Sequence, residues 1–132
     1  MTMDWSENWG LVQELQRMER SMAWKVACNE GAIGQNDMKE FDVDGVTVLL
    51  ARVGEEYFAY PPLCPHQEEP LRKGLCDGEL ITCFKHIWQW DLRTGICAGT
   101  ESRIPLKMYQ VRKAAGQVEV FIEQPLVYEY DT

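Results

Sequence analysis

The sequence predicts an all-β fold, a sandwich or barrel of short antiparallel strands, preceded by one short helix. Three observations predict the β part. Runs rich in β-branched and aromatic residues are short, turn residues recur about every 8–12 residues, and Asp44-Gly45 between two such runs is a strong hairpin signal. An apolar content of 45% and an aromatic content of 11% are enough for a core in one domain of 132 residues.

The helix is expected in residues 1–22, whose pattern of apolar and charged residues differs from that of the rest of the chain. Apolar residues recur there near helical spacing with charged residues between them, namely Trp5, Trp9, Val12, Leu15 and Met22. Such an N-terminal extension either packs on its own domain or docks on a partner or a second subunit. The sequence leaves both possibilities open.

The β region is expected from residue 23 to residue 123. We expect strands at residues 24–28, 38–43, 46–53, 56–60, 80–84, 87–92, 106–113 and 118–123. Turns are expected at Gly54-Glu55, at 93–95 and at 114–117, where glycine recurs. The acidic and aromatic tail, residues 124–132, is expected to wrap the surface or fray.

Two cysteine–histidine pairs dominate the chain. Cys64-Pro65-His66 and Cys83-Phe84-Lys85-His86 form the pattern C-x-H-x16-C-x2-H, which uses both histidines of the sequence. The pattern places two thiolates and two imidazoles on two loops, within about residues 61–92. That donor set suits a Rieske [2Fe–2S] cluster, with two Cys on one iron and two His on the other. It also suits a tetrahedral zinc ion.

The arrangement of the pairs favours the two-iron cluster. Structural zinc sites usually bring like ligands together, as in C-x2–4-C and H-x3–5-H, whereas each pair here is mixed and the order repeats. The surrounding loops are apolar, which limits water access to a redox centre and tunes its potential. A zinc-stabilised binding module without a redox role remains the alternative from another class.

The amino-acid sequence of both loops resembles the cluster-binding signature of soluble Rieske-type ferredoxins. The matching segments are C-P-H-Q-E-x-P-L at 64–71 and I-T-C-x-x-H-x-W-x-W-D-x-x-T-G at 81–95, and the resemblance extends over residues 24–122. It is greatest to the ferredoxin components of toluene/alkene-type diiron monooxygenases. The resemblance implies a Rieske-type antiparallel β-sandwich with a small cluster-binding subdomain, carrying one [2Fe–2S] cluster.

Residue by residue, the resemblance implies a role for each ligand. Cys64 and Cys83 would bind the inner iron, and His66 and His86 would bind the outer iron near the surface. Trp88 corresponds to a tryptophan beside the cluster, either at the docking surface or packed under the second loop. The further candidates for docking or for supporting the ligands are Gln67, Pro65 and Lys85.

The function implied is electron transfer without catalysis. The chain would carry single electrons from a flavin/iron–sulfur reductase to the hydroxylase protein of an oxygenase, as in aromatic hydrocarbon catabolism. A Rieske ferredoxin of an aromatic-ring-hydroxylating dioxygenase is the alternative. No third histidine exists for a histidine-based triad, and no G-x-G-x-x-G or Walker-type loop supports nucleotide binding. No small-molecule substrate is therefore expected.

One departure from the high-potential Rieske proteins predicts a low reduction potential. Those proteins carry an extra cysteine in each ligand loop, and the two are joined in a disulfide; this sequence has Glu69 and Lys85 at those positions. Those proteins also have a hydroxyl residue where this sequence has Trp88. Fewer donors to the sulfurs stabilise the reduced cluster less. We expect a midpoint near the low end of the range from roughly −150 to +300 mV, and a value above about +100 mV would contradict this.

Charge and the remaining cysteines bear on location and partners. The net charge of −8 disfavours nucleic acid and anionic membranes. The N-terminus has Asp4 and Glu7 and lacks a signal-peptide pattern, and no apolar run is long enough to span a membrane, so a cytoplasmic protein is expected. Cys28, Cys76 and Cys97 are then expected to be free thiols. Acidic candidates for a partner interface are Glu40, Asp42, Asp44, Glu68 and Glu69.

Overall fold

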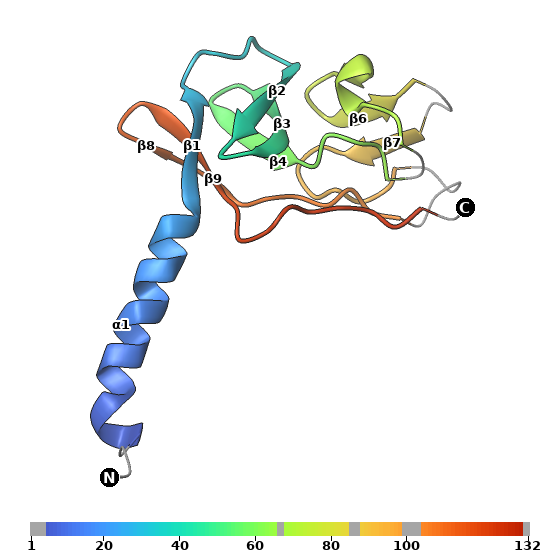
Figure 1. Ribbon diagram of the computed structural model, residues 1–132. Helices are drawn as coiled ribbons and strands as arrows, with labels where there is room; N and C mark the ends of the chain where they lie inside the picture. Colours follow the sequence, from blue (N-terminus) through green and yellow to red (C-terminus); the bar gives the residue numbers. More distant parts are fainter. Residues whose placement is uncertain (1–4, 66–67, 85–87, 99–103, 131–132) are drawn as a thin grey trace.

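The computed structural model describes residues 5–65, 68–84, 88–98 and 104–130 (Figure 1). Within these ranges one helix precedes three antiparallel three-stranded sheets, which confirms the predicted fold class. The helix is α1 (Trp5–Ala23). In spatial order the first sheet is β1 (Trp24–Asn29), β9 (Gln117–Phe121) and β8 (Val111–Ala114); the second is β2 (Asp37–Val43), β3 (Val46–Val53) and β4 (Glu56–Tyr60); the third is β5 (Leu75–Cys76), β6 (Leu80–Cys83) and β7 (Trp88–Asp91).

The second sheet lies between the other two, and the sequence of β3 explains why. Successive side chains of a strand point to opposite faces. Val48 and Leu50 join a core shared with β9, whereas Leu49 and Ala51 join a core shared with β6 and β7, and all four are fully buried. A strand covered on both faces needs a continuous apolar run, and residues 48–51 supply one.

We call the two cores the base core and the site core. The base core consists of Ile33, Val43, Val48, Leu50, Tyr57, Ala59, Tyr109, Val118, Val120 and Ile122. The site core consists of Leu49, Ala51, Tyr60, Cys64, Leu71, Cys76, Ile81, Cys83, Trp90, Leu92 and Leu106. Each fully buried Leu, Ile or Val contributes roughly 1.5–3 kcal/mol relative to exposure. We call the first and second sheets, packed around the base core, the base sandwich. The third sheet packs against it through its own apolar face.

Tight turns set the register of the hairpins. The β2–β3 turn has positive φ at both Asp44 and Gly45, 53° and 85°, as a type I′ turn requires. The β8–β9 turn likewise has positive φ at Ala115 and Gly116, 53° and 78°. These turns suit the twist of antiparallel strands and leave no freedom for a one-residue slip.

The structure differs in detail from the expected elements. The strand expected from residue 106 begins only at Val111, because the preceding segment bonds elsewhere: Leu106 N–H donates to Gly95 O, and Tyr109 forms an isolated bridge with Ala59. The turn expected at 114–117 is present, with Ala115 and Gly116 as its central residues between the paired Ala114 and Gln117. Sequence patterns also missed the 3-10 helix η1 (Leu71–Lys73) and the short strand β5, where Cys76 is buried.

The helix α1 extends away from the β-sheets (Figure 1). Its described apolar side chains are largely exposed, including Trp9 at 55% and Met22 at 68%. Its C-terminal end is anchored to the strand region, where Ile122 N–H donates to Ala23 O across 2.8 Å. Trp9, Leu11, Leu15, Met18 and Met22, which are all more than half exposed, are therefore not packed on the sheets. Within the described ranges, no helix is both long and apolar enough to cross a membrane.

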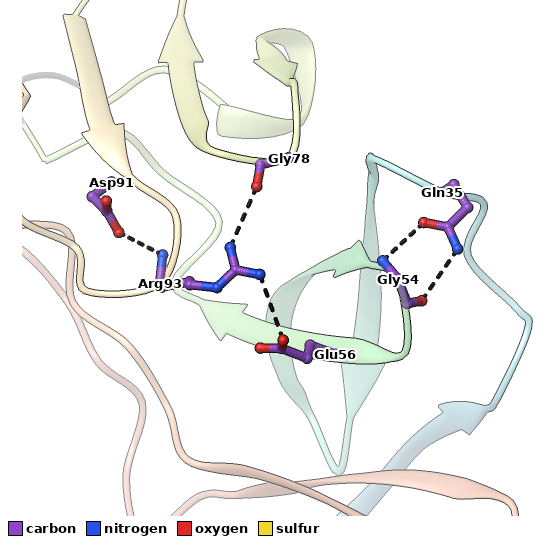
Figure 2. A network of polar contacts seen from close by, with 6 residues as sticks. All are labelled: Gln35, Gly54, Glu56, Gly78, Asp91 and Arg93. Atoms are coloured by element: carbon purple, nitrogen blue, oxygen red, sulfur yellow. Dashed lines mark hydrogen bonds and ion pairs between the residues drawn. The ribbon is translucent and has the colours of Figure 1, made fainter.

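Arg93 joins the third sheet to the second (Figure 2). It follows β7, and its guanidinium donates to Gly78 O across 3.4 Å and lies 3.5 Å from Glu56 Oε1 on β4. The same guanidinium lies 5.6 Å from the centre of the Phe58 ring. Both partners of the ion pair are exposed, so the pair itself contributes little energy.

Candidate metal centre

The first ligand loop begins where β4 ends. Pro61 and Pro62 follow Tyr60, and proline cannot continue the ladder of backbone hydrogen bonds. The chain then folds back on itself: Leu63 pairs with Pro70 in an isolated antiparallel bridge, and Cys64 N–H donates to Glu69 O across 2.8 Å. These contacts close a short loop whose first residue is Cys64.

The second ligand loop is the turn of the β6–β7 hairpin. Cys83 and Trp88 form the last pair of the ladder, so residues 84–87 connect the two strands. Phe84 follows Cys83 and is 56% exposed, whereas Cys83 itself is 2% exposed. The hairpin thus buries its cysteine and presents the next side chain to solvent.

The structure places both predicted sulfur ligands in the site core. Cys64 is 0% exposed and Cys83 is 2% exposed, and the two come from separate loops that meet over the same apolar side chains. Burial disfavours a bare thiolate, but a bound metal cation reverses that preference and deprotonates the thiol. Two buried sulfurs at the ends of two closed loops fit the cysteine side of a [2Fe–2S] centre.

The two histidines fall outside the described residues. His66 and Gln67, predicted in the first loop, and Lys85 and His86, predicted in the second, are not among them. The described ranges therefore hold two of the four predicted ligands. In those ranges no group of three or more His, Cys, Asp or Glu side chains is placed to hold a metal ion.

The other predicted site residues lie close to the two cysteines in the chain. Pro65 is buried directly after Cys64. Trp88 is partly buried, packs against the site core and lies 6.4 Å from the Trp90 ring, centroid to centroid. This packing fits the supporting role; its docking role stays a prediction. Of the acidic candidates, Glu40 pairs with Arg72 and Asp44 with Lys25.

Backbone packing fixes the segment between the two loops. Gly74 ends η1 so close to β6 that a Cβ atom there would lie 1.9 Å from Thr82 O. Only glycine permits this approach, which presses the segment against the residue before Cys83. Within the site core, the Tyr60 hydroxyl donates to Leu92 O, and Trp90 Nε1 donates to Ile104 O across 3.0 Å.

Two aspartates cap the turns beside the β6–β7 hairpin. Asp77 accepts hydrogen bonds from the N–H groups of Glu79 and Leu80, and these bonds lower the pKa of its carboxyl. Asp91 accepts from the N–H groups of Thr94 and Arg93, and its pKa is lowered for the same reason. The charged carboxylate is the form that these turns favour.

Burial has the opposite effect on the thiols that are not predicted ligands. Burial raises the pKa of Cys76 within the site core, partly offset by a backbone hydrogen bond at Gly78. Burial likewise raises the pKa of Cys28 on β1. None of the five cysteines is joined in a disulfide in the structure. Cys28, Cys76 and Cys97 are thus unpaired in disulfides, as expected.

One contact to the site could not be predicted from the ligand motifs. The hydroxyl of Tyr130, in the C-terminal tail, donates to Cys64 O across 2.8 Å. The tail was expected only to wrap the surface or fray. Its tyrosines were the available signal, because a buried phenol seeks a hydrogen-bond partner, but the partner lies 66 residues away in the chain.

Comparisons with known proteins agree with this geometry. The family described as Rieske [2Fe-2S] domain matches residues 23–110. The methanesulfonate monooxygenase ferredoxin subunit of Methylosulfonomonas methylovora is 34% identical over 111 residues, 83% of this chain and 89% of that protein. The ferredoxin component of the alkene monooxygenase system of Xanthobacter autotrophicus is 32% identical over 69 residues, 52% of this chain and 57% of that protein.

A solved structure shares the fold. It is titled as a complex of reduced oxygenase and oxidized ferredoxin in carbazole 1,9a-dioxygenase, and one of its chains superposes with a TM-score of 0.70 at 25% identity. The match covers 80% of this chain and 98% of that chain. Ferredoxins of both monooxygenase and dioxygenase systems are thus similar to this chain.

Proposed function

Because this chain belongs to the Rieske [2Fe–2S] domain family, we propose that it is the ferredoxin component of a multicomponent oxygenase. In this role it carries single electrons and catalyses no reaction of its own. The observation that carries the proposal is the pair of buried sulfurs, Cys64 and Cys83, at the ends of two closed loops in one apolar core.

The proposed ligands are the four residues of the two pairs. Cys64 and Cys83 would bind the inner iron, and His66 and His86 the outer iron. When bound, the [2Fe–2S] cluster supplies a site that accepts and releases one electron. The domain that holds it is proposed to be residues 23–123, with 1–22 as an N-terminal extension and 124–132 as a C-terminal tail.

The described residues exclude water from the inner side of the site. Leu71, Ile81 and Trp90 are fully buried in the core that holds both cysteines. A dry, rigid surrounding reduces the rearrangement that accompanies a change of charge, and it tunes the potential. Phe84, 56% exposed beside Cys83, offers an apolar contact to a partner at the same end of the molecule.

The proposed partners are a flavin/iron–sulfur reductase and the hydroxylase protein of the oxygenase. The solved complex of oxygenase and ferredoxin in carbazole 1,9a-dioxygenase supports the second of these. Transient carriers use small interfaces, often below about 1,200 Å², because they must leave after each transfer. We propose that the encounters take place in the cytoplasm, without nucleic acid or membrane as partners.

The oxygenase is proposed to be a monooxygenase of the toluene/alkene diiron type. Two observations support this choice: the loop sequences around Cys64 and Trp88, and the similarity to the alkene monooxygenase ferredoxin. A ring-hydroxylating dioxygenase is the second candidate, favoured by the structural similarity to a chain of the carbazole dioxygenase complex.

A stopped-flow experiment tests the function and separates the two candidates. The holoprotein is reduced anaerobically and mixed with the oxygenase component of a toluene/alkene-type monooxygenase or of a ring-hydroxylating dioxygenase, and reoxidation is followed by visible absorbance. Faster reoxidation by the monooxygenase supports the specific proposal. Faster reoxidation by the dioxygenase selects the second candidate. A colourless protein with bound zinc would overturn the electron-carrier function.

A further inference from the structure

The C-terminal tail returns to the candidate metal centre. Figure 1 shows the red end of the chain running beside the orange segment that precedes β8, toward the end of the molecule where the ligand loops lie. We call residues 124–130 the tail strap. Nothing in the ligand motifs requires such a segment, because the pairs at 64–66 and 83–86 lie far from it in the sequence.

The tail strap is fastened along its length by the segment before β8. Leu126 N–H donates to the Tyr109 hydroxyl across 2.8 Å, and Lys107 N–H donates to the Tyr128 hydroxyl across 2.7 Å. The Lys107 ammonium donates to Val127 O across 2.5 Å and lies 5.3 Å from the centre of the Tyr128 ring. These contacts fix the direction of the strap before it reaches the first ligand loop.

Tyr130 connects the strap to Cys64 itself. Its hydroxyl donates to Cys64 O across 2.8 Å, and its ring stacks edge-on against Tyr128 at 6.4 Å. The N–H of Cys64 donates to Glu69 O. Both backbone polar groups of Cys64 are thereby held, the N–H from within the loop and the carbonyl from the tail.

We propose that the tail strap positions the first ligand loop, with Tyr130 as the positioning residue that fixes the backbone of Cys64. The proposal rests on the proposed function, since it assigns the strap a role toward the bound cluster. Fixing the carbonyl of Cys64 restricts the rotation that would carry its sulfur away from iron. The strap therefore slows release of the cluster and holds the geometry of the first ligand.

The test compares full-length holoproteins that differ in one hydroxyl. Tyr130→Phe removes the donor to Cys64 O, and Tyr57→Phe is the matched control, because the Tyr57 hydroxyl accepts from Gly31 N–H across 3.1 Å in the base sandwich. Cluster release into excess chelator is followed by visible absorbance. We expect release from the Tyr130→Phe variant to be about fivefold faster than from the wild type, as loss of one such hydrogen bond implies. Release from the Tyr57→Phe variant stays within about twofold, because its lost bond lies outside the ligand loops.

Two further readouts separate positioning from general stability. The EPR line shape of the reduced cluster is expected to change in Tyr130→Phe and to match the wild type in Tyr57→Phe. Lys107→Met, which loosens the strap, should speed cluster release when it is introduced into the wild-type protein. It should add little to the effect of Tyr130→Phe, because both substitutions act through the contact of Tyr130 with Cys64.

The outcomes distinguish the two proposals. A wild-type protein that binds no cluster contradicts the proposed function. A wild type that binds the cluster, with Tyr130→Phe showing the same release rate and the same EPR line shape, overturns the role of the strap alone. Equal acceleration in Tyr130→Phe and Tyr57→Phe also overturns it, since the effect would then be general loosening.

Discussion

Two buried sulfur atoms, those of Cys64 and Cys83, define the site at the scale of single residues. A third thiol, that of Cys76, lies in the same core and is 5% exposed, yet no histidine follows it closely in the chain. Burial alone therefore does not identify a ligand. The distinction comes from the position of each cysteine at the start of a closed loop.

Serine or alanine substitutions test this distinction. Cys64→Ser and Cys83→Ser are each expected to abolish iron binding, because a hydroxyl is a poor substitute for a thiolate ligand to the cluster. Cys76→Ala, which removes an equally buried sulfur, is the matched control and should retain iron near the wild-type level. Iron content per chain after reconstitution is the measurement. Full iron binding by Cys64→Ser would remove that residue from the ligand set.

The sequence supports predictions about single residues where chemistry repeats locally, and the ligand roles of the two pairs stay predictions. Both cysteine–histidine pairs were recognisable because each lies within four consecutive residues. The contact from Tyr130 to Cys64 was not predictable, since it joins residues 66 apart and depends on the path of the whole tail. Gly74 was missed for the same reason: its need for glycine comes from Thr82 on another element.

At the scale of elements, the site depends on how closely the segment after the first loop approaches β6. The backbone of Gly74 lies against Thr82 O, and a Cβ atom would meet that oxygen at 1.9 Å. The contacting atom belongs to the backbone of a paired strand, so it cannot move aside as a flexible side chain would. The residue after Thr82 is Cys83, and displacement of the strand would reach this proposed ligand.

Gly74→Ala is therefore expected to destabilise the protein by roughly 1–3 kcal/mol, the usual cost of overpacking. Gly34→Ala is the matched control, because a Cβ atom at Gly34 meets nothing within 4 Å. Urea unfolding of the two variants measures the difference. Equal midpoints for both variants would show that the close approach at Gly74 is not present in solution.

The aspartate-capped turns make the third sheet sensitive to acid. The folded-state pKa values of Asp77 and Asp91 are lowered below the ordinary value of about 3.9, mainly by backbone hydrogen bonds. Each carboxylate therefore contributes stability that is present above about pH 4 and is lost as the pH falls through the lowered pKa.

The double variant Asp77→Asn/Asp91→Asn tests this sign. It should be less stable than the wild type at pH 6, and the difference should shrink at an acidic pH below the lowered pKa values, where the wild-type carboxylates are protonated. Chemical unfolding of both proteins at the two pH values gives the comparison. A difference that stays the same at both pH values would exclude the carboxylate charge as its cause.

Elements were predictable where the turn chemistry is local. Asp44-Gly45 gave the β2–β3 hairpin with correct inner ends, and β4 was predicted with its observed bounds. The segment after Leu106 has the composition of a strand but pairs only through Tyr109, because Ala59 and Gly95 take its backbone bonds. The two-residue strand β5 carries too little sequence to be recognised.

At the scale of the whole molecule, the predicted ligand loops and the exposed apolar residues of α1 lie in different regions. The ligand loops lie at the end formed by β6 and β7, whereas α1 leaves from β1 at the base (Figure 1). Leu11, Leu15 and Met18 of α1 are each more than half exposed. The sequence pattern predicted the helix, but not that it would stand clear of the sheets. Its docking role stays a prediction.

The net charge of −8 is also a property of the whole chain, and it predicts charge-steered encounters. Reduction by the partner reductase should slow as salt is added, because screening weakens attraction to a basic partner surface. The measurement is the second-order rate constant of reduction between low and high ionic strength. A rate that is insensitive to salt would remove steering as a reason for the acidic composition.

The EPR spectrum of the reduced protein tests the central claim most directly. Reduction of the reconstituted holoprotein with dithionite should give a Rieske-type signal from one unpaired electron per chain, in a brown-red sample containing two irons and two sulfides per chain. A colourless protein that binds zinc and gives no signal after reduction would contradict the assignment of the two cysteine–histidine pairs to a [2Fe–2S] cluster.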